Sequence, residues 1–399
     1  DGLEIDLDRI PRKYAGLDGL ELALSESQER MAIVVAPEDA EYCIRTAERQ
    51  NLQATPVARV TADRRLGMYW KGTAIANLSR DFLDSSGAMR TVEAVIAAPE
   101  GKGPFGFSRE GDGDVRRASG SRKTADEWSG VITHLNRCGR QGLVERFDST
   151  IGARTVLMPF GGRTQTSPAE AMAARIPAAG GETGTVSVMA AGYDPEIARW
   201  SPFHGGFYAV IEAVSRAVAA GASPDEMYLT LQEYFERLEA DPLKWGKPVS
   251  ALLGALEVQL GLEIAAIGGK DSMSGSFEDL HVPPTLAAFA MAPARLDNIV
   301  SPEFKAAGSE VLLLEVPMDA YCTLDLGRFR ELLRYIHRLI AGGHAAACRS
   351  LRTGGIVSAI TEMSFGNMIG FNLGRGPKEI DELSYPRYGS FIVELKHGR

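Results

Sequence analysis

Apolar residues recur at helical spacing in two long segments and form short continuous runs elsewhere, which predicts helices interleaved with strands. The two helical stripes stop at Gly221 and Gly261, and glycine is a common helix C-cap. The first stripe comprises Phe207, Val210, Ile211, Val214, Ala217 and Val218. The second begins beside Pro248 and comprises Val249, Leu252, Leu253, Leu256 and Leu260. Such a stripe normally faces the core of a domain.

Short apolar runs predict the strands. They are Met31–Val35, Ala54–Thr61, Leu66–Trp70, Thr73–Leu78, Thr185–Met189, Ile264–Ile267, Thr285–Met291, Val311–Val316 and Phe391–Val393. Gly72 lies between two of these runs and indicates a hairpin, whereas residues 1–29 read as polar and turn-rich. Further helices are predicted from Pro37 to about Gln50, from Phe329 to Ile340, and through Ile360. Helices interleaved with mostly continuous apolar strands predict a layered α/β arrangement of the α+β class.

Composition divides the chain into four segments. Gly, Pro, Ser and charged residues without apolar periodicity dominate residues 96–126, which we interpret as a linker between residues 1–95 and the block 127–297. A final block follows at residues 298–399. Four basic residues of the linker have two interpretations, a solvated segment and a phosphate-binding patch: Arg116, Arg117, Arg122 and Lys123.

A weak internal repeat relates the two ends of the chain. Leu24-Ser25 and Ile33-Val34 recur at the same spacing as Leu383-Ser384 and Ile392-Val393. We therefore expect related terminal strands in the first and last segments.

Composition also limits the functional classes. The 399 residues are 45% hydrophobic and 24% charged, and no apolar run approaches the roughly 20 residues of a membrane helix. The acidic first residues lack the pattern of a secretion signal, so we expect a cytoplasmic protein with no membrane partner. The four cysteines are far apart and include no C-x-x-C pair, which favours reduced thiols over a zinc site or disulfides. A net charge of −9 disfavours a nucleic-acid partner.

The strongest candidate for chemistry is the segment from Gly268 to Ser272. An apolar run, Ala265–Ile267, leads into Gly268, Gly269, Lys270, Asp271 and Ser272. Two glycines with positive φ would direct backbone N–H groups toward an anion, the lysine would add a cation, and the aspartate could hold a divalent metal. The spacing is not that of a Walker loop. The alternative is a plain hairpin with a solvated lysine.

Other candidates are weaker on chemistry alone. Glu212 and Arg216 are i, i+4 on a predicted helix, which is typical of a surface ion pair. His204 precedes the start of that helix, where anions are favoured, although a lone histidine is commonly structural. Asp148 and Thr150 suit turn capping. The remaining histidines show no spacing that indicates a metal cluster or a triad.

Three sequence motifs resemble those of a known family. They are Gly268 to Ser274, Arg146 to Val156, and Ser201 to Gly206 with the helix that follows. In order and spacing they resemble the second of the two homologous halves of the phosphoribosylformylglycinamidine synthase family, within the aminoimidazole ribonucleotide synthetase superfamily of ATP users. The resemblance covers most of the chain, and Gly-Lys-Asp-Ser-Met-Ser is its most specific word.

The resemblance implies a domain plan and partners. Residues 127–297 would be a synthetase-like N-terminal domain. Residues 1–95 would end the C-terminal-type domain of the first half, and residues 298–399 would begin that of the second. The chain would then be a fragment, whose partners are the missing first half and a glutaminase domain. Apolar strand edges left at both ends also predict self-association, for example as a homodimer.

The resemblance also implies ATP or ADP and Mg²⁺ as cofactors. Phosphate contacts would come from Gly268, Gly269, Lys270, Asp271, Ser272, Asp148, Thr150, His204 and Arg216, and metal contacts from Glu212 and Asp271. The chain departs from the family in three places. In the E-x-x-x-N pair that holds magnesium, Glu212 matches but Arg216 replaces the asparagine. An aspartate-rich segment retains only Glu182, and an aspartate pair before Gly354 reads Ser350 and Thr353.

The implied reaction is an ATP-dependent amidation. In the family, ATP activates the formyl-amide oxygen of formylglycinamide ribonucleotide, and ammonia from glutamine displaces the phosphate. The first hypothesis is that this chain is part of that purine-pathway ligase, with the catalytic residues in the missing half. The second is a non-catalytic nucleotide-binding scaffold half. The third is a selenophosphate synthetase or thiamine-monophosphate kinase, against which the Gly-Lys-Asp-Ser-Met-Ser word and the missing aspartates both count.

Overall fold

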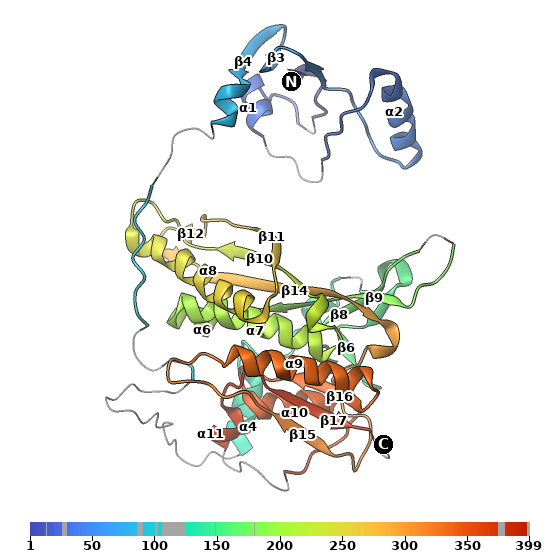
Figure 1. Ribbon diagram of the computed structural model, residues 1–399, viewed down its shortest axis with the longest axis vertical. Helices are drawn as coiled ribbons and strands as arrows, with labels where there is room; N and C mark the ends of the chain where they lie inside the picture. The colour runs from blue at the N-terminus through green and yellow to red at the C-terminus, as the bar shows by residue number, and fades with distance from the viewer. Residues whose placement is uncertain are drawn as a thin grey trace. The chain divides into compact units, whose positions relative to one another are not determined.

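A computed structural model describes residues 1–12, 14–25, 30–85, 91–99, 103–105, 125–147, 149–178, 180–373 and 380–396 (Figure 1). The chain divides into two units, Asp1–Thr91 and Val92–Arg399, which are taken one at a time below. The predicted division of the second unit near residue 297 remains a prediction.

The first unit contains a four-stranded sheet. Its order is β2-β1-β3-β4, in which β1 is Gly2–Asp6, β2 is Ala58–Thr61, β3 is Arg65–Trp70 and β4 is Thr73–Ser79. The strand β1 runs parallel to β3 and antiparallel to β2. The helices are α1 (Gly19–Leu24), α2 (Ala40–Arg49) and α3 (Arg80–Asp84). The β3–β4 hairpin confirms the turn at Gly72, whose φ is 75°.

Two predictions for the first unit are wrong. Residues 1–29 include β1 and α1, because Leu3 and Ile5 alternate with acidic residues and a capping box starts α1 at Asp18. Residues Met31–Val35 form no strand, and Met31 is 94% exposed. An apolar run needs a neighbouring strand for its backbone groups, and none of the described strands pairs with it.

The second unit contains a six-stranded sheet in the order β11-β10-β14-β9-β8-β5. Its strands are β5 (Thr155–Leu157), β8 (Met172–Arg175), β9 (Thr185–Gly192), β10 (Tyr228–Tyr234), β11 (Ala266–Lys270) and β14 (Thr285–Arg295). Neighbours are antiparallel except β10 and β11, which are parallel because α8 (Pro242–Leu262) crosses over between them. Together α6 (Pro195–Trp200), α7 (Pro202–Ala219) and α8 cover one face (Figure 1).

The helices α7 and α8 differ in how they use their apolar stripes. The stripe of α7 is fully buried, as predicted. The predicted stripe of α8 faces outward instead, and Leu260 is 70% exposed. The opposite side of α8 carries small residues, so the backbones approach closely: a Cβ on Gly206 would lie 2.0 Å from the Ala251 carbonyl, and one on Gly254 would lie 2.0 Å from that of Phe203. Close backbone packing thus outweighs the leucine stripe.

A second layer lies on the far side of α7 and α8 from the sheet (Figure 1). It contains a three-stranded sheet, β15-β17-β16 (Val311–Leu314, Phe391–Leu395 and Ala345–Ser350), with α9 (Leu326–Ala341) and α10 (Gly355–Phe365). Shorter elements are α4 (Ala125–Thr133), α5 (Gln141–Val144), α11 (Ile380–Ser384), β6 (Phe160–Gly161), β7 (Ser167–Pro168), β12 (Ser276–Phe277) and β13 (Leu280–His281). One hydrophobic core runs from the six-stranded sheet through α7 to β16 and β17. The α+β class is therefore confirmed.

No helix within the described ranges is both long and apolar enough to span a bilayer.

Candidate functional site

The Gly268–Ser272 segment is a strand and its end, not a glycine turn. Gly268, Gly269 and Lys270 belong to β11 at the edge of the six-stranded sheet. Neither glycine has a positive φ. Gly269 is needed for another reason, because a Cβ there would lie 2.5 Å from the Leu231 carbonyl of β10. Both sequence interpretations, a phosphate-binding glycine turn and a hairpin, are therefore wrong in geometry.

Lys270 is the exposed positive charge of this segment. It is exposed, and none of the described residues hydrogen-bonds or ion-pairs with its side chain. It lies opposite Gln232 in the parallel pairing of β10 and β11, so its side chain shares the sheet face of Gln232. That face is the one without helices, because Leu231 and Glu233, the neighbours of Gln232, point toward α7 and α8.

Asp271 belongs to a different environment from that of Lys270. It lies near Glu233, which is 8% exposed and whose Oε1 has no hydrogen-bond partner. Burial, together with the charge of Asp271, raises the pKa of Glu233 from 4.5 to about 7. The backbone N–H of Ser272 donates to the Glu233 carbonyl at 3.1 Å. This end of the sheet therefore carries a pair of acids on one face and a free lysine on the other.

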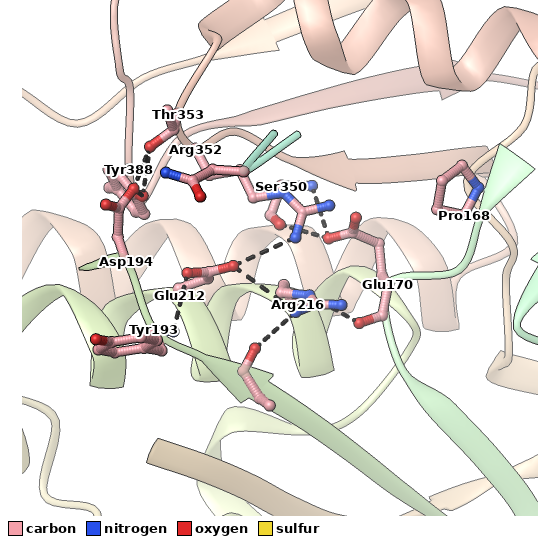
Figure 2. A network of polar contacts seen from close by, with 12 residues as sticks. Pro168, Glu170, Tyr193, Asp194, Glu212, Arg216, Ser350, Arg352, Thr353 and Tyr388 are labelled. Carbon is pink, nitrogen blue, oxygen red and sulfur yellow. Dashed lines mark hydrogen bonds and ion pairs between the residues drawn. The ribbon is translucent and has the colours of Figure 1, made fainter. Parts of the chain in front are cut away.

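Glu212 and Arg216 form the second candidate cluster, on α7, and are not a surface pair. Arg216 Nη1 lies 3.7 Å from Glu212 Oε1, and Arg352 Nη1 lies 3.3 Å from the same oxygen (Figure 2). The other oxygen, Oε2, accepts from the backbone N–H of Tyr193 at 3.3 Å. Arg216 also donates to the carbonyls of Ala191 at 2.7 Å and Glu170 at 3.0 Å. The glutamate is 7% exposed.

The cluster continues into the second layer. Arg349 Nη1 lies 3.2 Å from Glu170 Oε1, and both residues are 1% exposed. Arg349 also pairs with Glu362 of α10, and Ser350 donates its hydroxyl to Glu170. We call this set the Glu212 network. It comprises Glu170, Glu212, Glu362, Arg216, Arg349 and Arg352.

A neighbouring carboxylate, Asp194, is also satisfied by the protein. Its Oδ1 accepts from the backbone N–H groups of Glu196 and Ile197 and so caps α6. Its Oδ2 accepts from the hydroxyls of Tyr388, at 2.7 Å, and Thr353 (Figure 2). Thr353, which stands where the family has an aspartate, thus acts as a donor to an acid of this chain.

The charges of the network oppose the cost of burial. Burial raises the pKa of Glu212 above its ordinary value, although Arg352 and Arg216 work against this. For Glu170 the balance is reversed: burial pushes the pKa up, but Arg349, Arg352 and Arg216 hold it below its ordinary value. Burial lowers the pKa of Arg349 to about 9. The arginines therefore favour the charged form of Glu170 and oppose the effect of burial on Glu212.

The expected magnesium ion does not fit at Glu212. Both carboxylate oxygens already have protein donors, and two guanidinium groups lie where a cation would bind. Among the described residues, no group of three or more His, Cys, Asp and Glu side chains is arranged to hold a metal. Asp271 lies near Glu233, and this pair alone is too small a group to hold a metal. The sequence-based assignment of Glu212 as a metal ligand thus disagrees with the geometry of its surroundings.

The remaining predicted residues are scattered. His204 is a structural residue in this geometry, because its Nδ1 contacts Ser201 Oγ at 2.7 Å and its Nε2 contacts the Tyr321 carbonyl at 2.8 Å. Thr150 precedes a 3-10 turn at Ile151–Ala153. Asp148 lies outside the described residues, as do Arg116, Arg117, Arg122 and Lys123. Glu182 is an exposed partner of Arg175.

The two clusters lie at the same end of the six-stranded sheet but do not meet. Gly192, which precedes Tyr193, pairs with Ala288 of β14, while Gln232 pairs with Ala287 on one side and Lys270 on the other. Three strand spacings therefore separate Lys270 from the Tyr193 backbone, or about 14 Å. The structure joins Glu212 with Arg216 but leaves Lys270, Asp271 and Ser272 apart from them.

Sequence reasoning missed Glu170, Arg349, Glu362 and Asp194. A signal existed, because Arg352 lies between Ser350 and Thr353, where a pair of acids was expected, and an arginine that is buried needs an acidic partner. The partners lie up to 180 residues away along the chain, so their identity could not be read from spacing.

Comparisons with known proteins indicate a class of synthases. Residues 1–71 match the family described as AIR synthase related protein, C-terminal domain. Over most of its length the chain is similar to one synthase of that class. At 26% identity, 93% of the chain aligns with 49% of the phosphoribosylformylglycinamidine synthase subunit PurL of Thermoplasma acidophilum. At the same identity, 93% aligns with 50% of the PurL subunit of Rhodospirillum rubrum.

Solved structures agree with this similarity in fold. T. maritima PurL complexed with ATP superposes on 98% of this chain and 56% of its own, with a TM-score of 0.64 and 20% identity. T. maritima PurL complexed with FGAR superposes with a TM-score of 0.64 and 19% identity, over 98% of this chain and 55% of its own. The resemblance inferred from the motifs is confirmed. The chain spans about half the length of the curated relatives it matches.

Proposed function

We propose that this chain forms the second synthetase-type half of an ATP-dependent amidoligase that acts on formylglycinamide ribonucleotide in purine biosynthesis. The observation that carries the proposal is the alignment of 93% of the chain with about half of each PurL subunit. The order of the three sequence words supports it. A first half would supply the working site, and a glutaminase domain would supply ammonia from glutamine.

Within that enzyme, we propose a scaffold role for this half. Phosphoryl transfer depends on cations and donors that are preorganised around the transferred phosphate. Here Glu212 is already paired with Arg216 and Arg352, while Ser350 and Thr353 stand where carboxylates are expected. These features favour the non-catalytic alternative over a second catalytic site.

The uncovered face of the six-stranded sheet is the proposed contact with the first half. Four apolar side chains lie in one row across four strands, because their positions pair in register: Met172, Met189, Met291 and Tyr228. They are between 37% and 52% exposed. A row of this kind on the solvent face of a sheet is typical of an interface. When the first half is absent, a second copy of this chain would cover the face, as a homodimer.

Nucleotide binding by this half is proposed at the Gly268–Ser272 segment. Lys270 is the exposed cation there without a partner among the described residues, and it belongs to the most specific sequence word. ATP or ADP would be held by the lysine and the free edge of β11. The magnesium expected from the resemblance would have to arrive with the nucleotide, since neither Glu212 nor Asp271 belongs to a metal-ligand group within the described part of the chain.

Calorimetric titration with ADP and ATP, with and without magnesium, tests this part. We expect binding by the full chain that is lost or strongly weakened in Lys270→Ala. No heat at millimolar nucleotide would reject a nucleotide role for this half. The amidoligase proposal is tested separately, by asking whether the chain co-purifies with, and restores activity to, a first synthetase half that lacks its own second half.

A further inference from the structure

The ion pairs of the Glu212 network join three acids and three arginines, and Asp194 lies beside them as a further acid whose charge also acts on Glu212. The three paired acids are Glu170, Glu212 and Glu362, and the arginines are Arg216, Arg349 and Arg352. Glu170, Glu212 and Arg349 are each less than 9% exposed. A buried charge is costly unless a partner neutralises it, and here each of the three glutamates has an arginine partner without any added ion. Asp194 is satisfied separately, by backbone N–H groups of α6 and by the hydroxyls of Thr353 and Tyr388.

We propose that Arg216 and Arg352 replace a metal ion beside Glu212 and hold the two layers of the second unit together without magnesium or nucleotide. Each arginine approaches the same oxygen, Glu212 Oε1, from a different element (Figure 2). Arg216 comes from α7, below the six-stranded sheet, and Arg352 follows β16 of the three-stranded sheet. Together they occupy the side of the carboxylate that a cation would need.

The network crosses between the layers at more than one point. Arg352 reaches from the end of β16 to Glu212 of α7. Arg349, within β16, reaches Glu170, which precedes β8. The Ser350 backbone N–H donates to the same Glu170 at 3.2 Å. Three neighbouring residues of one layer therefore attach to acids of the other, so the network positions the layers rather than a ligand.

Electrostatics explains why magnesium would be excluded. A dication placed at Glu212 would lie beside the guanidinium groups of Arg216 and Arg352, and like charges repel strongly in a largely desolvated site. A metal would also have to displace a guanidinium group, because both oxygens of Glu212 already accept from protein donors. Replacing Arg216 and Arg352 should have the opposite effect on magnesium. Glu212 would then lack an arginine partner, and a dication could neutralise its charge.

The test is thermal unfolding of the full chain with 10 mM magnesium chloride or with EDTA, at matched ionic strength. We expect the wild-type Tm to be the same in both, and Arg216→Asn/Arg352→Ser to lose roughly 5–10 °C. Magnesium should restore at least about 2 °C of that loss, whereas sodium chloride should not. Adding Glu212→Gln should abolish the restoration. The matched control is Arg334→Asn, which removes an exposed pair with Asp225.

Three results would overturn the proposal. The first is a wild-type Tm that rises with magnesium and no longer does so in Glu212→Gln. The second is a double variant that unfolds at the wild-type Tm, and the third is a destabilised double variant that magnesium does not restore. If the double variant does not fold, Arg216→Asn and Arg352→Ser are measured singly, and each should gain a smaller dependence on magnesium. The proposed scaffold role rests on the same pairing of Glu212 and would be weakened by these results. Nucleotide binding at Lys270 and the amidoligase assignment play no part in these readouts, so they fail independently of this proposal.

Discussion

The Glu212 network and the Gly268–Ser272 segment lie at one end of the same sheet, yet they treat charge in opposite ways. In the network each acid faces arginines of the chain itself, and the site is buried. In the segment Lys270 is exposed and unpaired within the described part of the chain. The contrast shows that two sites expected from the same family can differ in exposure. The charged groups around Glu212 are buried and paired, whereas Lys270 is exposed to solvent.

The difference also distinguishes two kinds of function. A buried network with matched charges restricts motion and fixes the packing of layers. An exposed lysine beside a free strand edge is available to a ligand or a partner chain. We therefore assign a structural role to the Glu212 network and a binding role to the segment around Lys270.

The largest contrast should appear on unfolding. Arg349→Met leaves the buried Glu170 without its guanidinium partner and leaves Glu362 with Arg352 alone, at 3.8 Å, so we expect a loss of roughly 3–5 kcal/mol in the free energy of unfolding. Arg334→Met, which removes an exposed pair with Asp225, should cost about 0–1 kcal/mol. Urea unfolding of both variants measures the comparison, and equal losses would contradict it.

A second contrast is the pH dependence of folding stability that arises from Glu233, near the Gly268–Ser272 segment. Glu233 has a folded pKa of about 7 against an ordinary value of 4.5. The folded state therefore binds the proton more tightly, so stability is fully present below pH 4.5 and falls as the pH rises through 7. The loss is at most about 3.4 kcal/mol, because one unit of pKa corresponds to about 1.36 kcal/mol. Urea unfolding at pH 5 and pH 8 should show this slope in the wild type but not in Glu233→Gln.

Asp271 provides the control for that slope. Its charge is the second cause of the raised pKa, after burial. Asp271→Asn should therefore reduce the slope without removing it. A wild type whose stability has the same pH dependence as Glu233→Gln would show that the carboxyl group is not desolvated.

A third contrast concerns ligand affinity. If Lys270 contacts a phosphate, Lys270→Ala should lose roughly 1.5–3 kcal/mol of ATP or ADP affinity, the range for a hydrogen bond to a charged group. Its stability should change little, because the side chain is exposed. Titration calorimetry measures the affinity, with Lys71→Ala, an exposed lysine of the first unit, as the matched control. Unchanged affinity in Lys270→Ala would leave the lysine a solvated residue.

The smallest effect is expected on assembly. Met189→Lys places a charge in the middle of the apolar row, so self-association should weaken by about tenfold, the equivalent of roughly 1.4 kcal/mol. Leu252→Lys changes the exposed stripe of α8 and should leave association unaltered. Light scattering over a concentration series compares the two. A larger effect of the α8 variant would assign the interface to α8 instead.

Much of the fold could be predicted because periodicity reports burial. The helix α7, the β3–β4 hairpin and the strands β9, β14 and β17 follow their patterns. The failures have physical causes. The leucine stripe of α8 indicates the wrong face, because Gly206 and Gly254 permit backbone contacts that leucines would prevent. The strand prediction at Met31–Val35 ignored the need for a neighbouring strand.

The candidate site could be predicted less well than the fold. The departures at Arg216, Ser350 and Thr353 were visible in the sequence, and they predicted an altered site. Their consequence was not visible, because the acids that compensate the arginines come from distant elements. Spacing along the chain cannot reveal such pairs, since tertiary packing brings them together.

The claim that this half is a scaffold is tested most directly by phosphate release from ATP with formylglycinamide ribonucleotide, magnesium and high ammonia. Losing one preorganised charge-stabilising group typically costs about 10²–10³ in rate, and this half lacks several. The account predicts no substrate-dependent phosphate release above background from the purified chain. Release that depends on the ribonucleotide and disappears in Lys270→Ala would show that this half is catalytic, and would contradict the account.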